Sequence, residues 1–206
     1  MGTDCGPVLA NLYLHYYEFR YIENKMKENK NNLSVVRKFN HTFRYIDDLG
    51  VINNNKFYDE VSKIYPNTLK LTRQNNDGDD TAQYMDLDIK IVNNEFRFKV
   101  YDKRDNFNFV INSFPYLSAN IHENNMLNVY VSQLVRYARI CTDISDFHDK
   151  HKYLCNKLIN NGFNEKKLIN KFKVFGNKHG NLMKKWNYKA SHNSLYIRFG
   201  IINRNN

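Results

Sequence analysis

The sequence predicts an α+β fold, with antiparallel hairpins in its first half and helices in its second. Between residues 42 and 101, short runs of β-branched and aromatic residues are separated by two-residue polar turns, which is typical of hairpins. From about residue 120 onward, apolar residues recur at helical spacing. The chain has 206 residues, 42% of them hydrophobic, which is enough for one sizeable core or for one domain with an appendage.

The first predicted element is a helix that begins at Gly6-Pro7. Proline is favoured at the first helical position, because its missing N–H would have no intrahelical partner there. One face of this helix carries apolar residues at i, i+4, i+7 and i+11, namely Ala10, Leu14, Tyr17 and Tyr21. We expect the helix to fade into the polar stretch 25–32.

A tight hairpin is predicted next. Residues 42–46 and 49–52 have strand-like sequences, and only Asp47-Asp48 separates them, so these two aspartates are the expected turn. Residues 57–64 then predict a short helix that ends before Pro66. Residues 69–73 predict a strand, and the Asn/Asp/Gly-rich stretch 74–80 a loop.

A second hairpin is predicted from residues 84–92 and 95–101, around the turn Asn93-Asn94. Side chains alternate between the two faces of a strand, so the apolar residues of its first strand share one face: Met85, Leu87, Ile89 and Ile91.

Three helices are predicted in the second half. They are centred on residues 131–138, 147–159 and 168–175, with Gly162 ending the second and Gly176 the third. We place a boundary near 118–125. The expected domains are a first domain at 1–118, a helical domain at 119–176, and a basic tail at 177–206 to which no structure is assigned.

The positive charge is concentrated late in the chain. The net charge is +10, and residues 150–189 alone account for it, with eleven lysines and one acid. Such a segment predicts a polyanionic partner, with nucleic acid first among the candidates. A solvated lysine face is the alternative, and the charge alone leaves it open.

Composition also bears on the compartment. The three cysteines are odd in number and have no C-x-x-C spacing, which favours a reduced intracellular setting, nuclear or cytoplasmic. No apolar run is long enough to span a bilayer, and the first residues do not resemble a secretory signal, so no membrane partner is expected.

The pair Asp47-Asp48 is the main candidate for chemistry. Mg²⁺ and Mn²⁺ prefer hard oxygen ligands, and nucleotidyl transfer uses two such ions a few ångströms apart. A hairpin tip holds carboxylates at a rigid, exposed point. Aspartate is also a common turn residue, so an acidic turn without a metal remains the alternative reading.

Several segments, taken in order, resemble reverse transcriptases of the Penelope-like retroelements. Tyr45-Ile46-Asp47-Asp48 resembles their Tyr-x-Asp-Asp signature, and residues 1–7 look like the turn that opens the preceding palm helix. Tyr84-Met85-Asp86-Leu87 is similar to the "F/Y-L-D" strand of that family. Residues 101–105, 113–115 and 133–139 follow in the family's order. The resemblance spans roughly residues 1–163.

The resemblance implies part of a right-hand polymerase palm, followed by a thumb-like helical domain. It implies RNA-directed DNA synthesis with two Mg²⁺ or Mn²⁺ ions, an RNA template, a DNA primer and deoxynucleotides. Asp47 would be the main metal ligand and catalytic residue, with Asp48 beside it. The residues expected to contact nucleotide, template or primer end are Gly2, Thr3, Pro7 and Tyr45.

The nucleic-acid-binding residues are expected on the second hairpin and on the basic helices. The resemblance brings Lys103 and Arg104 to the primer. Arg136 and Arg139 stand off the apolar stripe of their helix, beside tyrosines, an arrangement that suits phosphate contact as well as it suits an ordinary solvated face. The basic segment contributes Lys166, Lys167, Lys171 and Lys173.

The sequence departs from the family at its start. In the family another essential aspartate precedes the opening turn, whereas Met1 already lies within that turn. We therefore expect a fragment that is inactive alone and whose partner is the missing N-terminal half. A non-catalytic nucleic-acid-binding remnant is the alternative, and a carboxylate nuclease has the least support, because no histidine or lysine base stands beside the aspartate pair.

A Cys/His set and an aromatic-rich stretch also suggest sites, but each has a simpler explanation. Cys141, His148, His151 and Cys155 resemble a zinc set, but most of it falls on one face of a single helix, which cannot surround a tetrahedral ion. Core thiols and surface or interface imidazoles are expected instead. The aromatic residues of 103–117 are expected to be core rather than a base-stacking platform.

Overall fold

The computed structural model describes residues 4–28, 33–54, 56–75, 78–109 and 111–186. It has an α+β fold, with two small antiparallel sheets and six α-helices among these residues, so the predicted fold class is confirmed at this level. The chain divides into two compact units, Met1–Met85 and Asp86–Asn206. The boundary predicted near 118–125 falls inside the second unit.

The described residues of the first unit form four helical segments and three strands. In chain order they are α1 (Gly6–Glu28), α2 (Leu33–Lys38), the 3₁₀ turn η2 (Phe39–His41), β1 (Thr42–Tyr45), β2 (Asp48–Val51), α3 (Phe57–Ile64) and β3 (Thr81–Tyr84). Helix α1 begins where the sequence predicts, and α3 has the predicted bounds. The short helix α2 was not predicted.

The core of the first unit is built on the predicted face of α1. Tyr21 is buried and packs with α3, while Leu14 and Tyr17 pack against the same cluster. The cluster also includes Phe57 from α3. Tyr21 donates a hydrogen bond from its hydroxyl to Glu60 Oε2 at 2.6 Å, so its buried ring keeps a polar partner.

The hairpin β1–β2 forms as predicted, but its turn lies one residue earlier than expected. Thr42 pairs with Val51 and Tyr45 with Asp48, so Ile46-Asp47 is the turn and Asp48 is the first residue of β2. The expected turn Asp47-Asp48 is therefore wrong. Ile46 has a φ of 53°, in the left-handed region that turn propensities do not assign to isoleucine.

The region between the hairpins also differs from the prediction. Residues 69–73 form no strand, and the strand of this region is β3, at 81–84. The second predicted hairpin is confirmed, as β4 (Leu87–Val92) and β5 (Glu95–Val100). Its turn residues Asn93 and Asn94 both have positive φ, 52° and 61°, which fits a type I′ turn. Tyr84 belongs to β3 and not to the strand of this hairpin.

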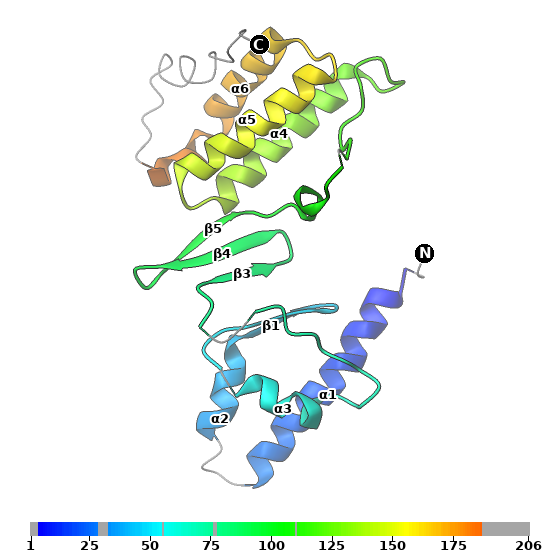
Figure 1. The fold of residues 1–206 in the computed structure, drawn as a ribbon, viewed down its shortest axis with the longest axis vertical. Helices are drawn as coiled ribbons and strands as arrows, with labels where there is room; N and C mark the ends of the chain where they lie inside the picture. Colours follow the sequence, from blue (N-terminus) through cyan, green and yellow to red (C-terminus); the bar gives the residue numbers. More distant parts are fainter. Residues whose placement is uncertain (1–3, 29–32, 55, 76–77, 110, 187–206) are drawn as a thin grey trace. The chain divides into compact units, whose positions relative to one another are not determined.

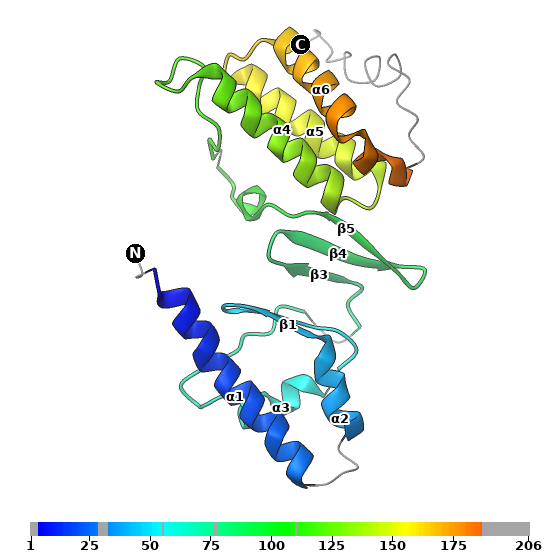
Figure 2. The ribbon, with the colours of Figure 1, turned by 180° about the vertical axis from the view of Figure 1, so that it is seen from behind.

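Three helices, α4 (Glu123–Ile140), α5 (Ile144–Asn160) and α6 (Glu165–His179), lie side by side in the second unit (Figures 1 and 2). The 3₁₀ segments η3 (Lys103–Asn106) and η4 (Gly180–Trp186) lie before and after them. Gly162 follows α5 with a φ of 93°, as its predicted role requires. The predicted end at Gly176 is wrong, because α6 continues through it to His179.

The core of the second unit lies between these three helices and β5. Its most deeply buried side chains include Leu134 of α4, Phe147 and Leu154 of α5, and Phe175 of α6. Thr142, in the α4–α5 connection, ties the helices to the hairpin. Its N–H donates to Phe98 O at 2.8 Å, and its hydroxyl accepts from Phe98 N at 2.9 Å.

The prediction of a surface or interface position is wrong for His151, one of the two histidines concerned. His151 is only 2% exposed and lies in the core, with its Nε2 2.7 Å from the hydroxyl of Tyr130 and its ring stacked on Phe172. Burial lowers the pKa of His151 to about 3. Cys141 is buried, as expected of a core thiol.

The prediction that the aromatic residues of 103–117 belong to the core is wrong for most of them. Phe107, Phe109 and Tyr116 are 50%, 65% and 56% exposed, and only Phe114 packs against the core. Asn161 of the α5 C-terminus binds the backbone of this stretch, through a hydrogen bond from its Nδ2 to Phe114 O at 2.7 Å.

Candidate functional site

The two aspartates of the first hairpin stand at its tip. Asp47 is the second turn residue, and Asp48 opens β2 directly opposite Tyr45. Opposed residues of an antiparallel pair point to the same face, so Tyr45 and Asp48 share one face of the hairpin with the next pair on that face, Phe43 and Gly50. We call this the outer face. Phe43 and Tyr45 are 50% and 54% exposed on it.

Tyr84 of β3 covers part of the outer face. A Cβ added to Gly50 would lie 3.3 Å from Tyr84 Cδ2, so the tyrosine ring lies directly on the glycine. Burial raises the pKa of Tyr84, and the nearby charge of Asp48 raises it further. The hydroxyl therefore stays protonated beside the carboxylate.

The opposite face of the hairpin, the inner face, is fixed to α1 by a polar network. Arg44 donates from Nε to Glu18 Oε1 at 2.7 Å and from Nη1 to Asn11 Oδ1 at 2.6 Å. The hydroxyl of Tyr65 donates to the same Glu18 oxygen at 2.7 Å. The pKa of Tyr65 is raised, first by burial and then by this bond. One carboxylate thus joins β1, α1 and the end of α3.

The turn itself holds a strained residue. A β-branched side chain with φ near 50° is an outlier, because its Cβ crowds the backbone in the left-handed region. Such strain persists where the surroundings over-determine the conformation, and it clusters at functional sites. Strand pairing places Tyr45 opposite Asp48, so Ile46 and Asp47 must close the chain within that register.

The tip therefore presents two exposed carboxylates on a fixed scaffold, which could supply oxygen ligands to Mg²⁺ or Mn²⁺. Within the described ranges, no three His, Cys, Asp or Glu residues are grouped to hold one ion, which bears equally on the zinc alternative. Pro7 lies exposed in the first turn of α1, whereas Gly2 and Thr3 lie outside the described residues.

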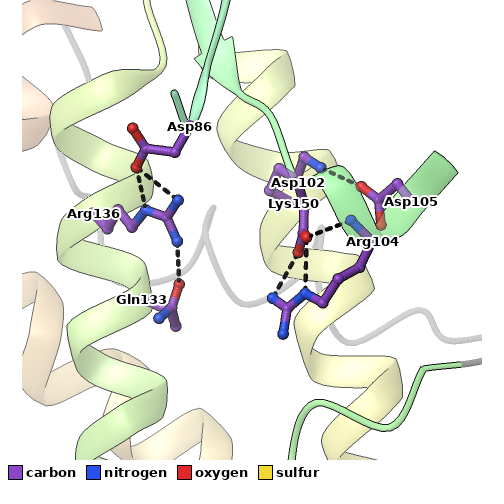
Figure 3. Close-up of polar contacts among 7 residues, drawn as sticks. All are labelled: Asp86, Asp102, Arg104, Asp105, Gln133, Arg136 and Lys150. Atoms are coloured by element: carbon purple, nitrogen blue, oxygen red, sulfur yellow. Dashed lines mark hydrogen bonds and ion pairs between the residues drawn. The ribbon is translucent and has the colours of Figure 1, made fainter. Parts of the chain in front are cut away.

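Two of the arginines predicted to bind nucleic acid are engaged by carboxylates of the protein (Figure 3). Arg136 binds Asp86 Oδ2 through Nη2 at 2.7 Å and Nε at 3.1 Å. Arg104 binds Asp102 with two parallel bonds, of 2.8 and 2.7 Å. These hydrogen bonds from Arg104 lower the pKa of Asp102 to about 2.

The predicted basic residues of α6 differ in their surroundings. Lys167 is paired with Glu123 of α4, at 2.6 Å between Nζ and Oε2. Lys166 and Lys173 are exposed, like Arg139 on α4, and Lys171 is half-buried. Lys103 is exposed in η3. The structure thus leaves exposed cations on both α4 and α6.

One surface feature was not predicted. A groove of about 640 Å³, which we call the α4–α6 groove, is lined by residues of these two helices. Arg136, Arg139 and Lys171 line it together with Lys178 and His179. The signal was present in the sequence, since residues 128, 131, 135 and 139 on α4 and residues 171, 174 and 178 on α6 follow helical spacing. Tyr84, Gly50 and Arg44 were likewise not predicted as parts of the hairpin site.

Comparisons with known proteins returned no relative. No protein-family model, no curated protein and no solved structure matches the chain. No described helix is long and apolar enough to span a membrane.

Proposed function

We propose that this chain contributes the metal-binding hairpin and a nucleic-acid-binding helical part to an RNA-directed DNA polymerase of the retroelement type. Asp47 and Asp48 supply oxygen ligands to two Mg²⁺ or Mn²⁺ ions. When bound there, the ions would supply the charge that activates the primer hydroxyl and stabilises the leaving pyrophosphate, and the role of Asp47 and Asp48 would be to hold them. Among the described residues no third carboxylate is grouped with this pair, so the proposed site needs a facing carboxylate from a second segment, and we expect the chain alone to be inactive.

The observation that carries the proposal is the geometry of the first hairpin. Asp47 and Asp48 are exposed at a tip whose inner face is fixed by Arg44 and Glu18. The turn residue Ile46 closes the tip with a left-handed φ of 53°, as Met85 closes the turn between β3 and β4 with a φ of 55°. Tyr45 stands opposite Asp48, on the face where a primer end would lie in the polymerases that the sequence resembles.

The basic helical part supports the nucleic-acid side of the proposal. Exposed cations on α4 and α6 suit contact with phosphates, and binding through them would weaken steeply with salt, as condensed counterions are released. Arg104 and Arg136 would first have to exchange their carboxylate partners for phosphate.

Primer extension on an RNA template tests the function. The 206-residue chain alone should not extend the primer. A version joined to the upstream half of a Penelope-like reverse transcriptase, the family that the sequence resembles, should extend it only with Mg²⁺ or Mn²⁺. In that version Asp47→Asn should abolish extension, because the amide keeps the shape of the carboxylate but loses its charge.

The matched control is Asp80→Asn, which removes one exposed aspartate from the loop before β3 and should leave extension unchanged. Robust synthesis by the chain alone would refute the need for a second half. Full synthesis by the joined Asp47→Asn version would refute the metal site and leave an acidic turn.

The alternative function is a non-catalytic nucleic-acid binder. The exposed basic residues of α4 and α6 favour this alternative, because they could bind nucleic acid whether or not Asp47 and Asp48 bind metal. It predicts salt-dependent duplex binding by the chain, with no extension by any joined version. Full-length Arg139→Glu and Lys166→Glu variants that bound duplex as tightly as the unmodified chain would refute the role given to the basic residues of α4 and α6.

A further inference from the structure

The α4–α6 groove has a second property besides its charge, which is an aliphatic lining. Val131 and Val135 of α4 are half-buried and pack against the core below them. Val174 of α6 is 53% exposed beside them. A surface that only binds phosphate gains nothing from valines, because phosphate and sugar do not bury them.

The two helices run in the same direction along the groove. Glu123 and Lys167 are paired near the beginnings of α4 and α6, and residues from both C-terminal ends line the groove. The lining extends from Asn128 to Ile140 on α4, which is about 18 Å of helix, or three turns. The groove between two neighbouring helices of a bundle is where a further helix packs, with its ridges between theirs.

The charge of the lining selects the kind of helix. Basic residues line the groove from both helices, and none of the lining residues is acidic. The last residues of this chain, 187–206, contain Lys189, Arg198 and Arg204 and no acid, so charge disfavours them as the occupant.

We propose that the α4–α6 groove binds an acidic amphipathic helix of a partner protein. Apolar side chains at i, i+3 or i+4, and i+7 of that helix would cover Val131, Val135 and Val174. Its flanking glutamates or aspartates would meet Arg139 and Lys178. This interaction does not depend on the chemistry proposed for the first hairpin, but it uses Arg139, which the proposed function also offers to phosphate, so the helix and a duplex would compete for that residue.

The test uses the full chain and a fluorescein-labelled synthetic helical peptide, with leucines along one face and glutamates flanking them. We expect micromolar binding by fluorescence anisotropy. Val174→Ser and Arg139→Glu should each weaken it by about fivefold or more, because each removes one of the two kinds of contact. Lys152→Glu, the same charge change at an exposed position of α5, should leave affinity within about twofold, since that residue does not line the groove.

Two control peptides separate charge from shape. A peptide with serines in place of the leucines should not bind, and neither should one with lysines in place of the glutamates. Equal binding of the serine peptide would overturn the proposal, because charge alone would then suffice. If Val174→Ser and Arg139→Glu left the affinity for the glutamate peptide unchanged, the proposal would be overturned as well.

Two other occupants are distinguished in the same experiments. If a short DNA duplex binds and Arg139→Glu abolishes that binding, while the peptide does not bind, the groove is a nucleic-acid surface and the proposal is wrong. If the chain alone forms dimers that Val174→Ser dissociates, the groove is a contact between two copies, and the proposal is again wrong. Failure of the peptide to bind would leave the proposed polymerase role intact, because primer extension tests that role separately.

Discussion

The ring of Tyr84 lies on Gly50, so close that a Cβ on the glycine would be 3.3 Å from the ring. A β-branched side chain at position 50 has no room without moving the ring. We therefore expect Gly50→Val to lower the free energy of unfolding of the first unit by about 1–3 kcal/mol, as overpacking does. Urea unfolding followed by tyrosine circular dichroism measures this.

The Tyr84→Ala background supplies the control for that prediction. There the valine should cost much less, because the atoms that it meets are gone, and the double-mutant cycle should show coupling of about 1 kcal/mol or more. Equal costs in both backgrounds would mean that the glycine is needed for its backbone and not for the ring.

The strained turn leads to a second prediction, with a matched pair of substitutions. Asparagine tolerates positive φ, so Ile46→Asn should raise the free energy of unfolding by about 0.5–1 kcal/mol. The reverse change in the second hairpin, Asn93→Ile at a φ of 52°, should lower it by about 1–2 kcal/mol. If Ile46→Asn destabilised the protein, the packing of the half-buried isoleucine would outweigh its backbone strain.

A third prediction concerns pH and the buried imidazole. The pKa of His151 is lowered from an unfolded value of 6.5 to about 3, so between these values the unfolded chain binds a proton that the folded chain does not. Stability of the second unit should therefore fall as pH falls from 6.5, with a slope that approaches about 1.4 kcal/mol per pH unit. The fluorescence of Trp186, the only tryptophan, reports this unfolding.

Two variants show whether that slope belongs to His151. His151→Phe keeps a ring against Phe172 and should flatten the pH dependence. His15→Gln, which removes an exposed imidazole from α1, should leave it unchanged. A wild-type midpoint that stays constant between pH 7 and pH 5 would contradict the prediction.

A fourth prediction follows from the pair of Asp86 and Arg136. Their side chains are 46% and 37% exposed, so the pair itself adds little stability, and Asp86→Asn should cost about 1 kcal/mol or less. The same change frees a guanidinium and removes a negative charge, so duplex affinity at low salt should rise by about two- to fivefold. Asp149→Asn, the same charge change at an exposed position of α5, should raise affinity less. Equal effects would mean that only net charge matters.

Local sequence patterns predicted much of this fold. Asn93-Asn94 predicted its hairpin because asparagine accepts positive φ, and both residues adopt it. Gly162 ends its helix for the same reason. The buried face of α1 followed from helical spacing alone, and Tyr21 confirms it.

The wrong predictions lie where tertiary contacts override the local preferences of the sequence. No propensity places isoleucine at a left-handed turn position, so the turn of the first hairpin was expected one residue late. Gly176 weakens a helix but does not end one whose neighbours Phe172 and Phe175 are buried. The role of Glu18 could not be predicted, because its partners Arg44 and Tyr65 are distant in sequence.

The two units differ in how much core they hold, and this has a consequence for local unfolding. Among the described residues, the buried cluster of the first unit has four members: Tyr21, Phe57, Ile64 and Tyr65. The buried cluster of the second unit is larger and has members from all three helices and from β5. Amide hydrogens of the first unit should therefore exchange at lower opening free energies. The aspartate hairpin belongs to that less protected unit. Any ligand that binds the folded hairpin but not the locally unfolded one would therefore slow amide exchange throughout the unit. Occupancy of the hairpin could then be measured from exchange rates alone, without any turnover.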